Sequence, residues 1–337
     1  MKIAILGAGS WAIALGNLLS ESGQAVTLWE PDQDAAHMID RLRQNWVKLP
    51  GVVILPEVTI EWELGKVISG ADYVIVALPS WAVSGTLCSI RAGVSLKVLK
   101  AVRGWIIASR GIELDGLALM SEVFETVMPA ALHDSLTVLA GPAHAEEVCK
   151  GSPTTLVVAG TDELLTKEIQ TVLSQSPLRI YTSADLRGVQ LGACFSDVIS
   201  IAVGLCDGLG YGDNTRGALL ARGLAEACRL GVALGGWRQT FSGLSVAGEL
   251  TACCMSPYSP NRLAGLHVGR GMTLSEAVCR IPKIVEGLDA TIAVNDLASK
   301  LIIDTPIARA VYEVLFQRTS PTAAAEALMT RAFAAEE

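Results

Sequence analysis

Four small or acidic residues near the start of the chain have the types and spacing that bind a dinucleotide. Gly7, Gly9 and Ala12 form a Gly-x-Gly-x-x-Ala turn, and Glu30 follows roughly 20 residues later. The first glycine permits a tight turn, the second lets the backbone approach a pyrophosphate, and the third small residue allows close helix packing. The phosphates would then meet the N–H groups at the start of a helix.

This chemistry requires a strand before the turn and a helix after it, and the sequence predicts both. Residues 2–6 are a short apolar run typical of a buried parallel strand, and a helical pattern of leucines then continues to about Gly23. A second apolar run, 25–29, ends directly before Glu30. Because the turn lies in its required strand–turn–helix–strand context, residues 1–30 predict a dinucleotide-binding unit.

Glu30 predicts which dinucleotide binds. A carboxylate at this position accepts hydrogen bonds from both hydroxyls of the adenosine ribose and would repel a 2′-phosphate. We therefore expect NAD rather than NADP, with Asp32 as the alternative acid. Ser10 and Trp11 of the turn, and Pro79 at the end of a later apolar run, are expected to contact the same cofactor.

Composition limits the class of protein. At 337 residues the chain is long enough for two domains with substantial cores. Its hydrophobic content of 51% and mean hydropathy of +0.43 are high, but no uninterrupted apolar run reaches about 18 residues. The net charge of −8 argues against nucleic acid and anionic membranes as partners, and it requires a local basic pocket for any anionic substrate.

The cysteines and histidines do not predict a metal site. The eight cysteines are scattered without a Cys-x-x-Cys pair, and the four histidines are not clustered with them. Glycines interrupt the apolar N-terminal span, and no Ala-x-Ala cleavage site follows it, so we do not expect a signal peptide. The expectation is a reduced, cytoplasmic protein whose cysteines fill core space.

The order of apolar runs predicts an α/β domain followed by an all-α domain. Eight runs are candidate strands: 2–6, 25–29, 52–56, 71–78, 105–109, 136–140, 154–159 and 178–181. Their alternation with helical segments predicts a mostly parallel, Rossmann-like sheet in residues 1–186, and helical periodicity dominates in 187–337. Within the second part we expect a buried helix at 192–205, a loop with a helix N-cap at 207–214, and a loop at 255–262.

Six motifs, in this order along nearly the whole chain, resemble the bacterial-type NAD(P)-dependent glycerol-3-phosphate dehydrogenase family. They lie at residues 7–11, 110–113, 141–148, 207–215, 222–226 and 259–262. The resemblance implies a Rossmann domain, an all-helical substrate domain and a homodimer. It also implies a small phosphorylated substrate and the reversible reduction of dihydroxyacetone phosphate to sn-glycerol 3-phosphate, which feeds phospholipid synthesis.

The same resemblance implies roles for individual residues. Arg110, Ser196 and Glu249 stand at the family's catalytic positions. Substrate-binding positions are Arg110, Gly141, Ser259, Asn261 and Arg262. Ala145 and Glu286 stand at cofactor-binding positions, and His144 is expected to line the cofactor pocket.

The sequence departs from the family pattern at this site. Ser196 and Asp197 stand where the family has a proton-transferring lysine and an asparagine, and Pro260 replaces a phosphate-binding arginine. A serine without an adjacent base is a poor acid or base near neutrality. Glu249 is one methylene longer than the family's aspartate, and Ala143 lacks the family's hydroxyl.

Three hypotheses therefore remain open for the activity. The chain reduces dihydroxyacetone phosphate with Arg110 as the remaining cation, although an arginine is a poor proton donor. Alternatively it is a dehydrogenase of the same fold with a less anionic substrate, or a non-catalytic homologue that binds NAD. A buried carboxylate is costly without a partner, so we expect Glu249 to pair with Arg110, Arg216 or Arg222.

Overall fold

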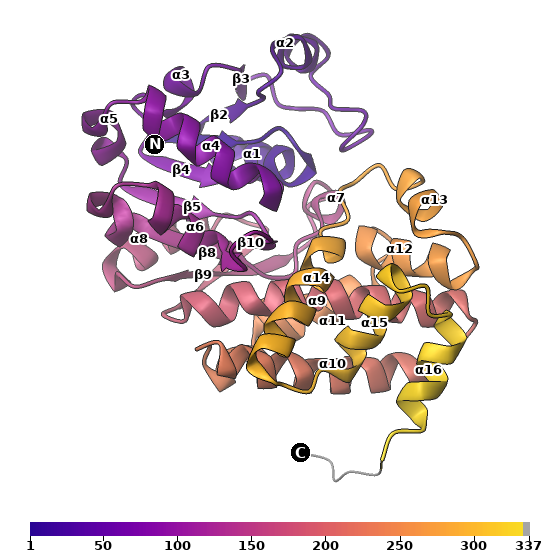
Figure 1. The fold of residues 1–337 in the computed structure, drawn as a ribbon. Helices are drawn as coiled ribbons and strands as arrows, with labels where there is room; N and C mark the ends of the chain where they lie inside the picture. The colour runs from indigo at the N-terminus through magenta and orange to yellow at the C-terminus, as the bar shows by residue number, and fades with distance from the viewer. Residues whose placement is uncertain (333–337) are drawn as a thin grey trace. The chain divides into compact units, whose positions relative to one another are not determined.

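A computed structural model describes residues 1–332 and divides the chain into two compact units. The first unit comprises residues 1–110 and 118–186, and the second comprises residues 111–117 and the chain from 187 onward. The colour ramp of Figure 1 follows this order, from the indigo and magenta strands of the first unit to the orange and yellow helices of the second.

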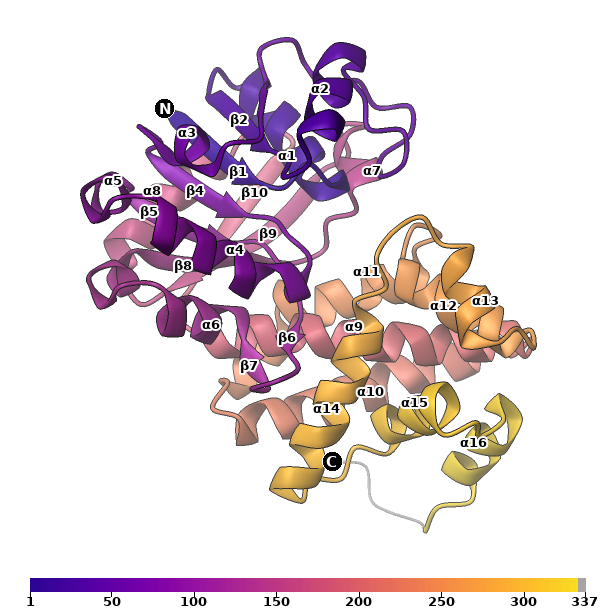
Figure 2. The same cartoon turned by 45° about the horizontal axis from the view of Figure 1, so that its top comes forward.

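The first unit is built on an eight-stranded sheet. Its strands are β1 (Lys2–Leu6), β2 (Ala25–Trp29), β3 (Thr59–Glu61), β4 (Tyr73–Val76), β5 (Gly104–Ile107), β8 (Leu136–Ala140), β9 (Thr154–Gly160) and β10 (Leu178–Ser183). They are ordered β10-β9-β8-β5-β4-β1-β2-β3, and Figure 2 shows β1, β4 and β5 side by side. Every neighbouring pair is parallel except β8–β9. The expected mostly parallel sheet is confirmed.

Helices follow most strands of this unit. They are α1 (Ser10–Glu21), α2 (Gln33–Leu42), α3 (Leu64–Ile68), α4 (Ser80–Gly93), α5 (Leu96–Ala101), α6 (Met120–Val127), α7 (Ala145–Val148) and α8 (Glu163–Leu173), with a 3₁₀ turn η1 (Ala130–Ser135) and a short strand β7 (Ala118–Leu119). The short strand β6 (Ile112–Glu113) belongs to the second unit. Ile3 and Ile5 share one core with α1, α7 and α8, while Ala4 and Leu6 on the opposite face are also fully buried. Burial on both faces explains why these strands are continuous apolar runs rather than alternating ones.

The expectation of a strand at residues 52–56 is wrong, because this run has no strand structure and the edge strand is β3. The side chain of Asn17 takes over the hydrogen bonds that a neighbouring strand would make. Its Nδ2 donates to the carbonyl of Val53 at 2.8 Å, and its Oδ1 accepts from the Leu55 N–H at 3.1 Å. The run is therefore tied to α1 as an irregular segment.

The strand order reverses at β1, which lies between β2 and β4. In open α/β sheets, ligands bind outside the carboxyl ends of the strands at such a reversal. The parallel strands β1, β4, β5 and β8 all end at this edge, so the segments that follow them are brought together. We call this edge the cofactor edge.

The second unit is helical apart from β6. Its helices are α9 (Leu186–Gly208), α10 (Asp213–Ala233), η2 (Arg238–Ser242), the π-helix η3 (Leu244–Gly248), α11 (Glu249–Met255), α12 (Pro260–Gly269), α13 (Leu274–Cys279), α14 (Gly287–Leu301), α15 (Pro306–Phe316) and α16 (Pro321–Met329). The expected all-α domain is confirmed in the part of the chain that the structure describes.

Glycines bring α9 and α12 into backbone contact. A Cβ atom at Gly204 would lie 2.0 Å from the Arg262 carbonyl oxygen, and one at Gly265 would lie 2.1 Å from the Ile201 carbonyl oxygen. These distances are far below van der Waals contact, so any side chain at either position would force the helices apart. The start of α12 is thereby fixed against the middle of α9.

Two local expectations for this unit are wrong. The region 255–262 is not entirely loop, because α12 begins at Pro260, with Ser259 as a side-chain N-cap that accepts from the Arg262 N–H at 3.3 Å. Serine before a proline at the first helical position is a standard start signal. At 207–214, α9 extends through Gly208, and α10 begins after Gly212 without a side-chain cap.

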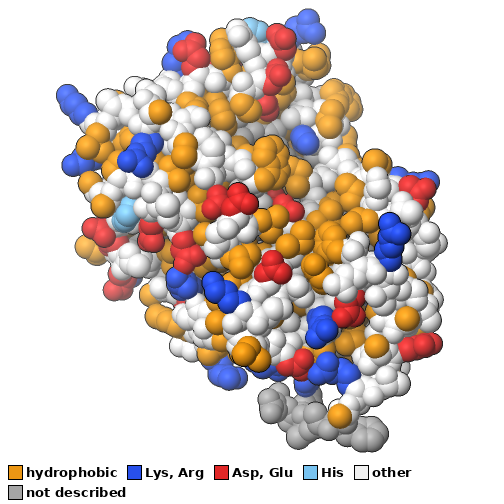
Figure 3. Space-filling view, viewed as in Figure 1, with side chains coloured by type: hydrophobic (Ala, Val, Ile, Leu, Met, Phe, Trp, Pro, Cys, Tyr) orange, Lys and Arg blue, Asp and Glu red, His pale blue; other side chains and the backbone are white. Residues whose placement is uncertain are grey.

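Among the described residues, α9 is long and apolar enough to cross a membrane, but 94% of its most apolar stretch is buried inside the protein. Acidic and basic side chains are interspersed over the face drawn in Figure 3. All eight cysteines are free thiols. Only three of them, Cys194, Cys253 and Cys254, are fully buried, so the expectation that the cysteines fill core space holds for part of the set.

Candidate active site

The Gly-rich turn at the end of β1 is fixed by its first glycine. Gly7 has a φ of +126°, a value that residues with a side chain rarely adopt. A Cβ atom here would lie 2.6 Å from the carbonyl oxygen of Ala77, just beyond β4. Both the backbone conformation and the close approach to the neighbouring strand therefore require glycine.

The second glycine leaves space for a ligand. Gly9 is the N-cap of α1 and has no side chain to cap the helix, and a Cβ atom built on it would have no protein atom within 4 Å. Ser10 and Trp11 begin the helix and are half-buried, whereas Ala12 is fully buried. The first N–H groups of a helix lack intrahelical acceptors, so this open space meets the donors that a pyrophosphate needs.

Glu30 lies directly after β2 and is half-buried. Burial raises the pKa of the Glu30 carboxyl group, and the negative charge of Asp32 raises it further. The Asp32 N–H donates to Glu30 Oε1 at 3.3 Å, and this hydrogen bond lowers the pKa in part. Asp32 itself caps α2, because its Oδ1 accepts from the Ala35 N–H at 2.8 Å. The structure therefore favours Glu30 over Asp32 as the group that is available for a ribose.

Three further predicted residues lie at the cofactor edge. Pro79 precedes α4, Arg110 follows β5, and Gly141 follows β8. Arg110 Nη2 donates to the Gly141 carbonyl oxygen, at a distance of 3.4 Å between the two atoms. Gly141 has a φ of +132°. Because β5 and β8 are parallel neighbours, Arg110 and Gly141 are brought together. Their substrate-binding roles stay predictions.

Two residues that tie this edge together were not identified from the sequence. The Ser109 hydroxyl accepts from the Leu78 N–H at 3.0 Å and donates to the Val76 carbonyl at 3.1 Å, which joins the ends of β4 and β5. Asn45 donates from Nδ2 to the Ala8 carbonyl at 2.9 Å and so holds the Gly-rich turn from outside. A polar residue at the end of a buried strand was a signal for Ser109, whereas no local pattern indicated Asn45.

The short helix α7 also lies at this edge. His144 is its N-cap residue, and Ala145 is its first residue and is buried. Helix α7 packs against α1, so Ala145 lies beside the helix whose N-terminus faces the Gly-rich turn. This position fits the cofactor-binding role predicted for Ala145.

In the second unit, Ser196 lies in the middle of α9 and is 1% exposed. Its hydroxyl donates to the carbonyl of Gly192, one turn earlier in the same helix, at 2.9 Å. The π-helix η3 packs on this turn, because a Cβ atom at Gly192 would lie 2.0 Å from Val246. The Ser196 proton is therefore used within its own helix.

Glu249 begins α11, directly after the π-helix, and is 1% exposed. The thiol of Cys253, one turn later, donates to Glu249 Oε1 at 3.0 Å. Of the three arginines considered as its partner, Arg216 is paired with Asp207 and Asp213 instead, and Arg222 is exposed on α10. The pairing of Glu249 with Arg110 stays a prediction.

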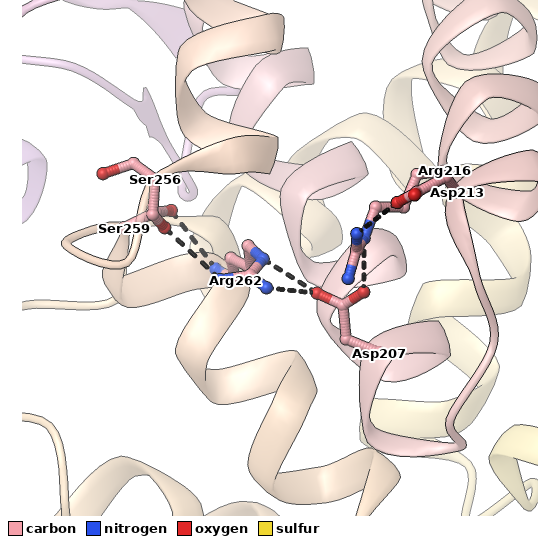
Figure 4. A network of polar contacts seen from close by, with 6 residues as sticks. All are labelled: Asp207, Asp213, Arg216, Ser256, Ser259 and Arg262. Carbon is pink, nitrogen blue, oxygen red and sulfur yellow. Dashed lines mark hydrogen bonds and ion pairs between the residues drawn. The ribbon is translucent and has the colours of Figure 1, made fainter.

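Figure 4 shows an ionic network that includes Arg262, one of the predicted substrate ligands. Asp207 accepts from Arg262 Nε at 2.8 Å and also binds Arg216 Nε at 2.7 Å. The Asp207 side chain is only 4% exposed, so two guanidinium groups surround one buried carboxylate. The network joins the end of α9 to the starts of α10 and α12. The substrate-binding role of Arg262 stays a prediction.

Asn261 is the second residue of α12 and is buried. Its Nδ2 donates to Asp197 Oδ1 on α9 at 2.6 Å, and its Oδ1 accepts from the Gly287 N–H at the start of α14 at 2.9 Å. Glu286, a predicted cofactor contact, directly precedes Gly287. Asp197, Asn261 and Glu286 are therefore joined through three helices, although they are far apart in the sequence.

Residues 1–332 contain no group of three or more His, Cys, Asp or Glu side chains that could hold a metal ion. The polar groups described above are instead hydrogen-bond donors, acceptors and single charges. They suit the binding of an organic cofactor and a polar substrate.

Comparison with known families covers both units. The family model for the N-terminus of NAD-dependent glycerol-3-phosphate dehydrogenase matches residues 2–166, and the model for the C-terminus of the same enzyme matches residues 185–326. Only the segment 167–184 and the short ends of the chain are not covered by these two matches.

Individual relatives match over the whole chain. A protein from Chlorobium phaeobacteroides named glycerol-3-phosphate dehydrogenase [NAD(P)+] is 40% identical over 331 residues, which is 98% of each chain. A protein of the same name from Carboxydothermus hydrogenoformans is 40% identical over 332 residues, 98% of this chain and 97% of the relative. A crystal structure of glycerol-3-phosphate dehydrogenase from Coxiella burnetii has a TM-score of 0.91 at 31% identity, and the match covers 98% of this chain and 99% of that one.

Proposed function

The chain belongs to the NAD-dependent glycerol-3-phosphate dehydrogenase family, and we propose that it catalyses the reversible reduction of dihydroxyacetone phosphate to sn-glycerol 3-phosphate with NADH. The observation that carries this proposal is that the family match extends over both units. A Rossmann-like unit alone occurs with many substrates, so the match of the helical unit is what supports the substrate.

The residues of the cofactor edge fit an NAD(P) molecule. The open space at Gly9 and the start of α1 hold the pyrophosphate, with Gly7, Ser10, Trp11 and Ala12 completing the turn. Pro79, Ala145 and Glu286 are assigned to the rest of the cofactor, and Glu30 to its ribose, which favours NAD over NADP. The bound nicotinamide supplies or accepts the hydride.

Hydride transfer places charge on the substrate carbonyl oxygen, and the chain must stabilise and protonate that oxygen. We assign stabilisation to Arg110, because a guanidinium keeps its charge and is a poor proton donor. Proton exchange is assigned to Glu249 rather than Ser196, because a carboxyl group is a common general acid or base and the Ser196 hydroxyl donates to the Gly192 carbonyl. The substrate phosphate is assigned to Asn261 at the start of α12, with Ser259, Arg262 and Gly141 as supporting residues.

The test is NADH oxidation, followed by absorbance at 340 nm, with dihydroxyacetone phosphate as substrate. Dihydroxyacetone is the matched control, because it has the same carbonyl and lacks the phosphate. We expect turnover with the phosphorylated compound, much less with the control, and a preference for NADH over NADPH. A lack of turnover above background at saturating enzyme and substrate would overturn the proposal.

One observation favours a second candidate, a dehydrogenase of the same fold that acts on a less anionic carbonyl compound. Neither Ser196 nor Pro260 carries charge, and two acidic residues, Asp197 and Glu249, are buried in the same unit. A screen of neutral carbonyl compounds with NADH distinguishes this candidate from the first. Tight NADH binding without turnover of any compound would indicate a non-catalytic homologue, and activity gained by Ser196→Lys with Pro260→Arg would identify it as a silenced enzyme.

We further propose a cytoplasmic homodimer without nucleic-acid or membrane partners. The family resemblance supports the dimer, and the net charge of −8 opposes binding to polyanions. Light scattering coupled to size-exclusion chromatography tests the dimer directly. A mass of one chain across the working concentration range would contradict it.

A further inference from the structure

The orientation of the Asn261 amide is determined by its two partners. The Gly287 N–H can only donate, so the atom 2.9 Å from it must be the acceptor Oδ1. The other atom is then Nδ2, which donates to Asp197 at 2.6 Å. The carboxylate of Asp197 favours the same orientation, because it accepts.

Backbone packing leaves Asn261 no freedom to move away from these partners. A Cβ atom at Gly287 would lie 2.8 Å from Asn261 Oδ1, so only glycine lets the start of α14 approach the amide. On the other side, the glycine contacts between α9 and α12 and the pairing of Arg262 with Asp207 hold the first turn of α12. Asp197 is 2% exposed and Asn261 is 4% exposed, so water cannot easily replace either bond.

The two bonds also fix what Asn261 can offer to a ligand. A side-chain amide has two N–H donors and one carbonyl oxygen. The Gly287 N–H occupies the oxygen, and Asp197 occupies one N–H. One N–H donor is left, and it suits an acceptor oxygen such as that of a phosphate.

We propose that Asp197 is a positioning residue, which fixes the Asn261 amide so that its remaining N–H donates to a phosphate oxygen of the substrate. The identity of the substrate rests on the proposed function, whereas the role of Asp197 rests on the geometry around Asn261. The Asn261 amide lies between Asp197 and the ligand. The positioning role therefore requires the acceptor oxygen of Asp197 but not its negative charge.

Two substitutions separate these properties. Asp197→Ala removes the acceptor and frees the Asn261 amide. We therefore expect the KM for dihydroxyacetone phosphate to rise about 10-fold, which corresponds to the loss of one charged hydrogen bond. We expect kcat to stay within about threefold of the original value. Asp197→Asn retains an acceptor oxygen in the same place and removes the charge. We expect the KM of Asp197→Asn for dihydroxyacetone phosphate to stay within about twofold of the original value. Because this substitution removes a negative charge near a phosphate, it favours a lower KM.

The matched control is Glu226→Gln, which alters another buried acid of the same unit. Glu226 accepts from the N–H groups of Ile307 and Ala308 at the start of α15 and is 2% exposed. We expect it to change thermal stability and leave the KM unchanged. An unchanged KM in Asp197→Ala, or an equal increase in Asp197→Asn and Asp197→Ala, would overturn the proposal, because a positioning role requires rescue by the isosteric residue.

A second measurement does not depend on turnover. In protein labelled with ¹⁵N at asparagine, one Nδ2 proton of Asn261 should resonate downfield because of its bond to Asp197, and the signal is assigned by its loss in Asn261→Ser. We expect Asp197→Ala to abolish the downfield shift of this proton. In Asp197→Asn the downfield shift should remain but be smaller. If dihydroxyacetone phosphate is not turned over but the shift behaves in this way, the proposed function fails and the positioning role stands. If Asp197→Ala leaves the amide signals unchanged, the positioning role fails.

Discussion

The candidate residues of the two units owe their geometry to different features of the chain. At the cofactor edge of the first unit, the geometry comes from the backbone, through the positive φ of Gly7 and Gly141 and the uncapped start of α1. In the second unit it comes from side chains, with Asp197, Asn261 and Glu249 contributed by three different helices. A backbone site tolerates few added atoms, whereas a side-chain site can change its chemistry on an unchanged scaffold.

This difference bears on the replacements that the sequence predicts at Ser196 and Pro260. In the turn at residues 7–12, Gly7 is required by its φ and by its close approach to Ala77, and Gly9 leaves open space at the start of the helix. Ser196 and Pro260 lie on α9 and α12, two helices that glycine contacts hold together. Because these contacts are made by backbone atoms other than those of Ser196 and Pro260, the packing of the two helices does not require a charged side chain at either position.

The largest expected effect is that of Gly7→Ala. The added Cβ would lie 2.6 Å from the Ala77 carbonyl and would have to adopt a φ of +126°. We expect a loss of at least about 3 kcal/mol in the free energy of unfolding, from strain and overpacking combined, and NADH binding weakened by at least about 100-fold. Calorimetric titration with NADH and chemical unfolding measure the two effects.

The control for this substitution is Gly23→Ala. Gly23 also has a positive φ, +84°, but a Cβ there would meet no atom within 4 Å. It should cost about 1 kcal/mol of stability and leave the Kd for NADH unchanged. Equal effects of the two substitutions on the Kd would show that the turn is not built by the close approach of Gly7.

Gly265→Ala tests the scaffold of the second unit. Its Cβ would lie 2.1 Å from the Ile201 carbonyl and would separate α12 from α9. We expect a loss of about 3 kcal/mol in unfolding free energy, with a higher KM for the substrate and a much smaller change in the Kd for NADH, because Glu286 is the one cofactor contact assigned to this unit. The control Gly217→Ala, on the exposed face of α10 with no atom within 4 Å of its Cβ, should stabilise the protein by about 0.5 to 1 kcal/mol. An NADH complex weakened as much as in Gly7→Ala would contradict the assignment of most cofactor contacts to the first unit.

The buried acid Glu226 gives the second unit a pH dependence. Burial raises the pKa of its carboxyl from 4.5 to about 7, opposed by the N–H groups of Ile307 and Ala308. Because the folded pKa is the higher one, this contribution to stability is complete below about pH 4.5 and decreases as pH rises through 7. Relative to Glu226→Gln, the wild-type protein should lose about 2 to 3 kcal/mol of unfolding free energy between pH 5 and pH 8. Urea unfolding of both proteins at pH 5 and pH 8 measures this difference. The same change in unfolding free energy with pH in both proteins would contradict the prediction.

The smallest effect concerns cofactor choice. Glu30→Gln removes the charge that opposes a 2′-phosphate, so the preference for NADH over NADPH should fall about 10-fold, as the ratio of the two Kd values. Asp32→Asn is the control, since Asp32 caps α2 and should affect stability by less than about 1 kcal/mol without changing that ratio. A tighter NADPH complex than NADH complex in the unaltered protein would refute the assignment of Glu30.

The sequence predicted the parts of the molecule in which local patterns determine structure. The turn at 7–12, the parallel strands and the long helices of the second unit were all identified, because periodicity and glycine spacing are local signals. The edge strand was misplaced because the Asn17 side chain satisfies the backbone of 53–55, a contact made over more than thirty residues of chain. The start of α12 was missed although Ser259-Pro260 is a helix-start signal, because a Pro/Ser-rich run also resembles a loop.

The side-chain part of the site was not predictable in the same way. The bond between Asp197 and Asn261 joins residues separated by 64 positions, and Arg262 meets Asp207 across 55. No pattern in a single sequence gives such pairs, because they depend on how glycines on two helices let the backbones meet. The sequence located the candidate residues, and the structure shows which partners occupy them.

The most direct test of the proposed activity is the oxidation of the product. Purified protein is given NAD⁺ with sn-glycerol 3-phosphate or with its enantiomer, sn-glycerol 1-phosphate, and NADH formation is followed at 340 nm. The two compounds have the same charge and composition, so only a site shaped for this substrate distinguishes them. We expect NADH formation with sn-glycerol 3-phosphate and none above background with the enantiomer. Equal rates with both compounds, or no reaction with either, would contradict the assignment.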